Sequence, residues 1–186
     1  MLTEAHLQYM GIPQAHWRAT LAQIPVHCAH ADFFAEYVDN IVANVKKPRG
    51  LYLFGFCSMG KSACAAIALK AAAAHEVYGF WINAKTVASH VIQETEWRDG
   101  RTTYDFCLQS PLLVIDEVQL RGDSRFTETI IEDLVRSRVD DMLCTIITSN
   151  HTPEVLKERY ASLGSVLMEA VLPLKVDGHN FREGMV

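Results

Sequence analysis

Residues 55–62 have the composition of a loop that binds phosphate. Their sequence, GFCSMGKS, matches the pattern G-x-x-x-x-G-K-[ST] at every fixed position. Glycines let such a backbone bend until successive N–H groups point at phosphate oxygens, and the N-terminus of the next helix adds positive partial charge. Lys61 would reach the β and γ phosphates, and the hydroxyl of Ser62 would ligate Mg²⁺. The nucleotide-contacting set is expected to be Gly55, Phe56, Cys57, Ser58, Met59, Gly60, Lys61, Ser62 and Ala63.

Two adjacent carboxylates, Asp116 and Glu117, follow the apolar run 112–115 about 55 residues after this loop. An Asp at the end of such a strand holds Mg²⁺ in P-loop ATPases, so Asp116 is expected to take that role together with Ser62. The next carboxylate, Glu117, would stand beside the γ-phosphate and orient or deprotonate the attacking water. The alternative is an ordinary acidic loop after a core strand, which the earlier phosphate loop disfavours. The pair predicts hydrolysis of ATP.

A third apolar run, 143–148, ends in Thr148, Ser149 and Asn150. If this run forms a strand between the other two, Asn150 would point at the γ-phosphate and hold the attacking water with Glu117. The alternative is that Ser149 and Asn150 begin a turn and cap the next helix. The residues alone favour neither.

Alternating apolar segments must position these groups. Apolar runs typical of strands occupy 51–54, 77–82, 112–115, 143–148 and 171–176, and helical patterns occupy 61–75, 84–95, 126–139 and 153–163. This alternation predicts a three-layer α/β sandwich with a mainly parallel five-stranded sheet, because parallel strands need crossover connections that cover both faces.

The first fifty residues precede this alternation. Short helical pieces are expected up to about residue 23, and 31–45 has the apolar stripe of an amphipathic helix. We therefore expect residues 1–50 to be an N-terminal segment and residues 51–186 to be the nucleotide-binding core.

Composition excludes several classes of protein. The 186 residues include 17 Lys+Arg and 22 Asp+Glu, a net charge of −5, so no global positive field draws the chain onto nucleic acid. The five cysteines contain no Cys-x-x-Cys pair for zinc or a redox disulfide, and no apolar run is long enough to span a membrane. No basic segment precedes the apolar residues at the N-terminus, as a secretory signal would require. A cytoplasmic protein without membrane contact is expected.

Nucleic-acid contact would therefore need a local patch or an assembly. The candidates for lining a DNA channel are Lys46, Lys47, Arg49, Arg121, Arg125, Arg136 and Arg138. The alternative for each is a solvated surface position balanced by Asp and Glu. The thiols of Cys57 and Cys64 are expected to fill space, with a redox switch on ATP binding as the alternative.

The three motifs GFCSMGKS, LLVIDE and TIITSN, with the Gly-Ile-Pro at 11–13 and the closing VDGHNFR, resemble the AAA+ ATPases of the DnaC/DnaI-type helicase loaders and IstB-type transposition proteins. The similarity covers nearly the whole chain. It implies a five-stranded AAA+ core of the ASCE type with little or no C-terminal helical lid. It also implies nucleotide binding through the loop, Mg²⁺ and hydrolysis through Asp116 and Glu117, and a sensor role for Asn150.

Two departures from the family bear on function. Loaders usually carry a separate helicase-binding region, whereas only about fifty residues precede the phosphate-loop strand here. The family also places an Arg in a Ser-Arg-Leu-like stretch to reach a neighbouring subunit, and the corresponding 164–169 stretch has none. Arg159 is the nearest candidate for this finger, or else a solvated surface residue.

The resemblance implies a factor in DNA replication that acts as an ATP-dependent oligomer, or as a member of a larger complex, on a replicative helicase or on single- or double-stranded DNA. An IstB-like transposition ATPase and a non-hydrolysing, nucleotide-gated adaptor are the alternatives. The adaptor is favoured by the lack of a clear finger, which in such enzymes is worth about 10³ to 10⁵ in rate. A small-molecule kinase is disfavoured because the adjacent carboxylates suit activation of water.

Overall fold

The computed structural model describes residues 2–24, 30–93, 96–98, 100–118, 125–159 and 161–177. The strands are β1 (Gly50–Phe54), β2 (Phe80–Asn83), β3 (Glu96–Arg98), β4 (Arg101–Thr102), β5 (Leu112–Asp116), β6 (Cys144–Ser149) and β7 (Val171–Lys175). The α-helices are α1 (Glu4–Tyr9), α2 (Ala31–Asp39), α3 (Ile41–Lys46), α4 (Lys61–Ala74), α5 (Ala84–Gln93), α6 (Thr103–Gln109), α7 (Arg125–Asp140), α8 (Pro153–Arg159) and α9 (Ala161–Ala170). Two single-turn 3₁₀ helices, η1 (Gln14–His16) and η2 (Leu21–Gln23), lie between α1 and α2.

Five strands form one sheet in the order β2-β5-β6-β1-β7, and every neighbouring pair is parallel. The predicted five-stranded sheet is thus confirmed. Strand β6 lies between β1 and β5, which is the condition set for a sensor role of Asn150. Because the strands are parallel, their carboxyl ends meet at one end of the sheet. The phosphate loop, the acidic pair and the polar end of β6 all follow strands at that end.

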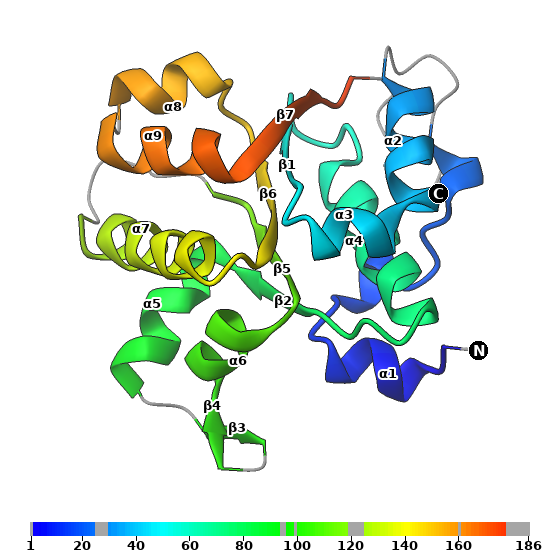
Figure 1. Cartoon of the computed structure of the whole chain (residues 1–186), viewed down its shortest axis with the longest axis horizontal. Helices are drawn as coiled ribbons and strands as arrows, with labels where there is room; N and C mark the ends of the chain where they lie inside the picture. Colours follow the sequence, from blue (N-terminus) through cyan, green and yellow to red (C-terminus); the bar gives the residue numbers. More distant parts are fainter. Residues whose placement is uncertain are drawn as a thin grey trace.

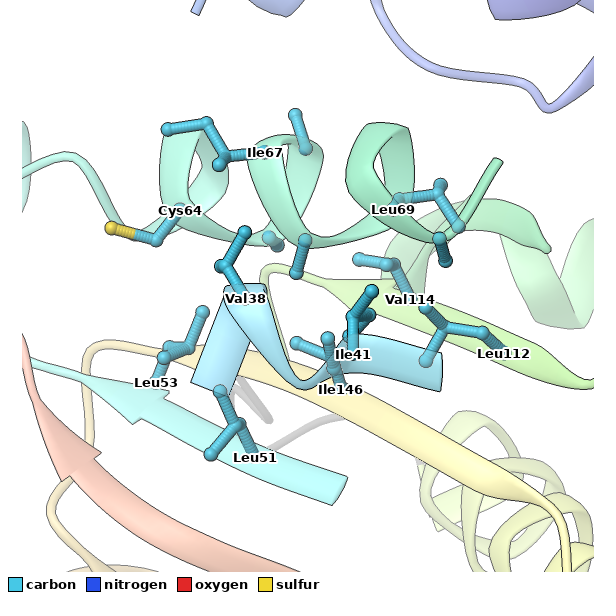
Figure 2. Packing of buried hydrophobic residues seen from close by; sticks show 14 of the residues in the cluster. Val38, Ile41, Leu51, Leu53, Cys64, Ile67, Leu69, Leu112, Val114 and Ile146 are labelled. Atoms are coloured by element: carbon cyan, nitrogen blue, oxygen red, sulfur yellow. The ribbon is translucent and has the colours of Figure 1, made fainter. Parts of the chain in front are cut away.

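Helices cover both faces of this sheet (Figure 1). Helices α2, α3 and α4 lie on one face, and α5 to α9 lie on the other. Successive strand residues alternate between the two layers. The cluster that includes α4 (Figure 2) takes Leu51, Leu53, Leu112, Val114 and Ile146, whereas the opposite cluster takes Tyr52, Leu113, Ile115 and Ile147. Burial on both faces explains why these strands are continuous apolar runs in the sequence.

Several element boundaries differ from the predicted ones. The helix predicted over 31–45 is two helices that meet at Asn40, where the backbone departs from helical angles (φ −100°, ψ 20°) and the side-chain amide donates to the carbonyl of Glu36 at 3.0 Å. The strand predicted over 77–82 begins only at Phe80. The helix predicted over 153–163 is likewise divided between α8 and α9. Helix α6 and the small antiparallel pair of β3 and β4 were not predicted.

Arg138 is part of the core, so its assignment as a DNA-channel candidate is wrong. Its side chain is 0% exposed on α7. The guanidinium donates to the hydroxyl of Thr145 and to the carbonyls of Cys107, Leu108, Ser110 and Cys144, at 2.6 to 3.3 Å. Burial lowers its pKa to about 10, which leaves it charged at neutral pH. Arg138 thereby ties α7 to β6 and to the C-terminal end of α6.

Described parts of the first fifty residues, at 7–12 and 34–45, pack against the sheet and α4. The backbone N–H of Trp81 on β2 donates to the carbonyl of Met10 at 2.8 Å, and Met10 and Ile12 are buried. The division at residue 50 remains a prediction. Among the residues described, none of the helices has the length and apolar character that crossing a bilayer requires.

Candidate functional site

The phosphate loop connects β1 to α4, and its backbone requires glycine at two points. Gly60 has φ +88° where α4 begins, and a β-carbon at Gly55 would lie 2.2 Å from the carbonyl oxygen of Val176. The Lys61 ammonium donates to the carbonyls of Gly55 and Phe56 at 3.0 and 2.7 Å. Burial lowers the pKa of Lys61, an effect that the nearby thiol of Cys57 and the acidic pair oppose. The loop thus holds a cation at its centre.

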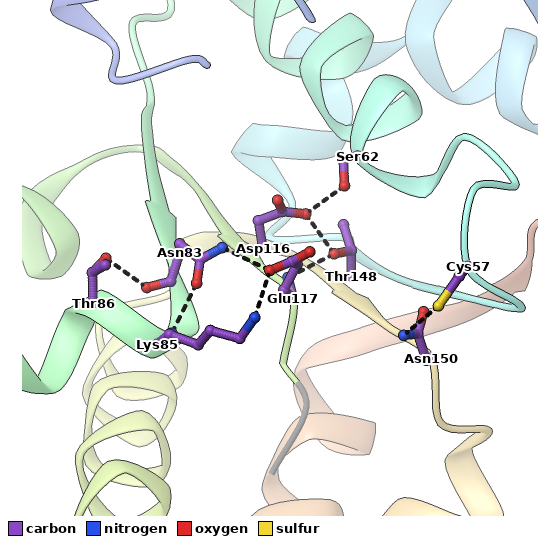
Figure 3. Close-up of polar contacts among 9 residues, drawn as sticks. All are labelled: Cys57, Ser62, Asn83, Lys85, Thr86, Asp116, Glu117, Thr148 and Asn150. Atoms are coloured by element: carbon purple, nitrogen blue, oxygen red, sulfur yellow. Dashed lines mark hydrogen bonds and ion pairs between the residues drawn. The ribbon is translucent and has the colours of Figure 1, made fainter. Parts of the chain in front are cut away.

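Asp116 ends β5 as a carboxylate that is only 6% exposed (Figure 3). Its Oδ1 accepts hydrogen bonds from the hydroxyls of Ser62 at 2.8 Å and Thr148 at 2.6 Å. Burial raises its pKa, although these two hydrogen bonds lower it. The described part of the chain offers Asp116 no ion-pair partner. The Asp116 carboxylate and the Ser62 hydroxyl thus offer Mg²⁺ two adjacent oxygen atoms, which is the type of ligand that this ion prefers.

Glu117 turns away from Ser62 and toward the end of β2 (Figure 3). Its Oε2 accepts from the amide of Asn83 and from the ammonium of Lys85, both at 3.2 Å. The Asn83 hydrogen bond and the Lys85 contact lower its pKa. The backbone of Glu117 is left-handed, with φ +57°, and its N–H donates to the Thr148 hydroxyl at 2.9 Å. Such a conformation in a residue other than glycine is often found at functional sites.

Asn150 links the end of β6 to the phosphate loop. Its side-chain amide donates to the Cys57 sulfur at 3.2 Å (Figure 3). The neighbouring Ser149 hydroxyl donates to the carbonyl of Val118 at 2.7 Å, which fastens the acidic turn to β6. Cys57 is exposed at the loop, so its assignment as space filling is wrong, whereas Cys64 is buried in the core as predicted.

A cavity of about 620 Å³ joins these groups. On the phosphate-loop side its wall consists of Cys57, Ser58, Gly60, Lys61, Ser62, Ala63, Asp116, Glu117, Thr148, Ser149 and Asn150. Gly55, Phe56 and Met59 belong to the loop but not to this wall, and Phe56 is 79% exposed. The opposite wall comes from the N-terminal segment, as Ala15, His16, Arg18, Ala19 and Gln23.

Sequence reasoning missed the residues that hold Glu117 and the opposite wall of the cavity. Asn83 and Lys85 follow a strand whose role depends on its place in the sheet beside β5, with Asn83 paired to Asp116 in register. A polar residue at the carboxyl end of an apolar run was the available signal for Asn83. No local pattern indicates that residues 15–23 face the phosphate loop.

The remaining candidates stay predictions or lie outside the site. Arg159 is the last residue of α8, and its side chain lies outside the described part of the chain, as does Arg121. Arg136 pairs with Glu132 on its own helix at 2.8 Å. The other basic candidates, Lys46, Lys47, Arg49 and Arg125, are exposed.

No family model and no curated protein matches the sequence. The crystal structure of the DnaC helicase loader matches with a TM-score of 0.74 and 20% identity, over 89% of this chain and 100% of that one. The crystal structure of DnaI matches with a TM-score of 0.76 and 20% identity, over 91% of this chain and 94% of that one. The structure of AMPPCP-bound DnaA from Aquifex aeolicus matches with a TM-score of 0.69 and 15% identity, over 91% of this chain and 54% of that one. The chain therefore has the AAA+ P-loop fold, and its resemblance to the DnaC/DnaI-type proteins is confirmed at the level of that fold.

Proposed function

We propose that the protein binds ATP with Mg²⁺ and hydrolyses it slowly. The observation that carries this proposal is the convergence of Lys61, Ser62, Asp116, Glu117 and Asn150 on one cavity at the carboxyl ends of parallel strands. The triphosphate would lie on the loop, where Lys61 would exchange its two carbonyl contacts for phosphate oxygens. The base and ribose would extend toward the wall of residues 15–23. The AMPPCP-bound DnaA structure, which shares the fold, supports a nucleotide at such a site.

Ser62 and Asp116 are the residues that would hold Mg²⁺. When bound, the ion would neutralise charge on the phosphates. Thr148 keeps the Asp116 carboxylate oriented and at the same time fixes the backbone of Glu117. Glu117 would orient the attacking water, and Asn150 would hold that water from the neighbouring strand. In the present state Asn83 and Lys85 both donate to Oε2 of Glu117, so release of these contacts would strengthen the carboxylate as a base for this step.

The engaged state of Glu117 also favours a second candidate, a nucleotide-gated adaptor that does not hydrolyse ATP. The amide and the ammonium both bind its Oε2 and lower its pKa, so in this state Glu117 is a weaker base toward water. Glu117→Gln separates the two candidates in a turnover assay at saturating ATP. The enzyme interpretation requires wild type to turn over measurably faster than Glu117→Gln. Equal rates for both proteins would rule out the enzyme and favour the non-hydrolysing adaptor.

We further propose that the protein works in DNA replication, on a replicative helicase or on DNA. Support comes from the fold, which is shared with a DnaC helicase loader, with DnaI and with DnaA, one structure of which is bound to single-stranded DNA. An ATP-dependent oligomer in a cytoplasmic setting is proposed on the same ground. In that oligomer Arg159 would reach the nucleotide of the neighbouring subunit.

Light scattering with and without ATP and Mg²⁺ tests this function, on wild type and on Lys61→Ala, which lacks the phosphate-binding ammonium. Single-stranded DNA is added in a second series. Assembly that needs ATP and is lost in Lys61→Ala would support the proposal, and a further DNA-dependent increase in mass would identify nucleic acid as a partner. Absence of ATP binding by wild type in equilibrium dialysis would overturn it.

A further inference from the structure

The cavity wall opposite the phosphate loop is made of two short turns outside the sheet. Residues 14–16 and 21–23 fold as η1 and η2, whose few internal hydrogen bonds leave many main-chain groups without helical partners. The Thr20 N–H donates to the side chain of Gln23 at 3.0 Å, and the indole of Trp17 donates to the carbonyl of Ile12 at 2.8 Å. These contacts shape the segment locally, but its position over the cavity needs an anchor in the core.

Lys70 on α4 is such an anchor. Its ammonium donates to the carbonyls of His16 at 3.4 Å, of Trp17 at 3.0 Å and of Ala19. An ammonium has three donors, so these three carbonyls use its full capacity. Among the residues described, Lys70 forms no ion pair, and burial lowers its pKa. A half-buried charge committed to main-chain carbonyls fixes the course of this segment.

The same helix carries both sides of the cavity. Helix α4 begins at Lys61 and continues without a break through Lys70, about 13 Å further along at a rise of about 1.5 Å per residue. The helix therefore holds the phosphate loop at its first turn and the opposite wall at its third. The ring of His16, on that wall, also packs against Trp81 of β2 at 5.9 Å between centroids.

We propose that Lys70 is a positioning residue for nucleotide binding, which holds the wall of residues 15–19 at the distance from the phosphate loop that the base and ribose require. This inference rests on the proposed nucleotide site. Without the ammonium, the wall would sample other positions, and part of the binding free energy would be spent on ordering it. Ligands that contact only the phosphate loop would not share this cost. Lys70 should therefore affect affinity for ATP but not for an inorganic polyphosphate.

The test compares ATP with inorganic tripolyphosphate, both with Mg²⁺, by calorimetric titration of the full chain. The variants are Lys70→Met, which keeps an unbranched stem without donors, Lys70→Arg, which keeps donors, and Lys46→Met as an exposed control. We expect Lys70→Met to weaken ATP binding by about tenfold, the scale for losing a charge-assisted hydrogen bond, and to leave tripolyphosphate binding within about twofold. Lys70→Arg should recover most of the ATP affinity.

Each other outcome has a definite meaning. Equal weakening for both ligands would assign Lys70 to general stability, and an unchanged ATP affinity would show that the wall needs no such anchor. Either result overturns the inference while the proposed function stands. Failure of the wild-type protein to bind ATP would instead overturn the proposed function itself.

Discussion

Replacement of Arg138 by leucine should destabilise the protein strongly. The guanidinium is 0% exposed and satisfies four main-chain carbonyls and one hydroxyl. Three of these carbonyls are buried, and each one left without a partner costs about 1–3 kcal/mol, or about 3–9 kcal/mol for the three. Removal of a buried charge returns several kcal/mol of desolvation energy. The net loss should be about 3–5 kcal/mol, a large share of the roughly 5–15 kcal/mol typical of a folded domain.

Urea denaturation followed by tryptophan fluorescence measures this loss, and a thermal scan should show a fall of about 10 °C at this chain length. Arg136→Leu is the matched control, because Arg136 lies on the same helix but is exposed and pairs only with groups at the surface. Its expected cost is below about 1 kcal/mol. A cost for Arg138→Leu no larger than that of the control would refute the reasoning, since the carbonyls would then be satisfied without the guanidinium.

Three further predictions concern the site. Asp116→Asn should raise the melting temperature of the protein without ligand, because burial raises the pKa of the Asp116 carboxyl. The folded protein therefore loses stability as pH rises from the pKa of this group in the unfolded chain through its pKa in the folded chain, and asparagine removes that loss. In the same thermal scan the variant should no longer be stabilised by ATP and Mg²⁺. Lys85→Met should increase basal ATP turnover at saturating nucleotide, because it removes one of the two groups that hold the Glu117 carboxylate. Gly55→Ala should abolish nucleotide binding and destabilise the fold in urea titration, since its β-carbon would lie 2.2 Å from a main-chain oxygen, whereas Gly100→Ala, also at positive φ but with open space, should leave binding unchanged.

The sheet could be predicted because each strand carries its own signal. The run at β5 is apolar at four consecutive positions and buried along its whole length, as helices on both faces require. Short elements carry no comparable signal. Helix α6 has seven residues and depends on a capping box between Thr102 and Asp105, and at the break at Asn40 a single side chain hydrogen-bonds to the backbone.

The residues of the candidate site also differ in whether a local sequence pattern could predict them. Lys61 and Ser62 belong to one contiguous motif, so both could be proposed as site residues from their spacing alone, and the structure places both at the cavity. Asn83 and Lys85 contact Glu117 only because β2 pairs with β5, which no local pattern specifies. Arg138 shows the opposite failure, because a count of basic residues in a helix does not reveal which of them faces the core.

Helix α4 explains why the local motif alone cannot describe the site. Its alanines at 65, 66, 68 and 72 are fully buried, so the helix lies close against the sheet with little side-chain bulk between them. Because α4 is one continuous helix from Lys61 to Ala74, the geometry of the helix sets the distance between its first turn and Lys70. The phosphate loop and the wall that Lys70 contacts are therefore both attached to one helix. The sequence motif predicts the phosphate end of the cavity, and under our proposal the fit of the whole nucleotide would also depend on this helix and on a segment about forty residues upstream of the loop.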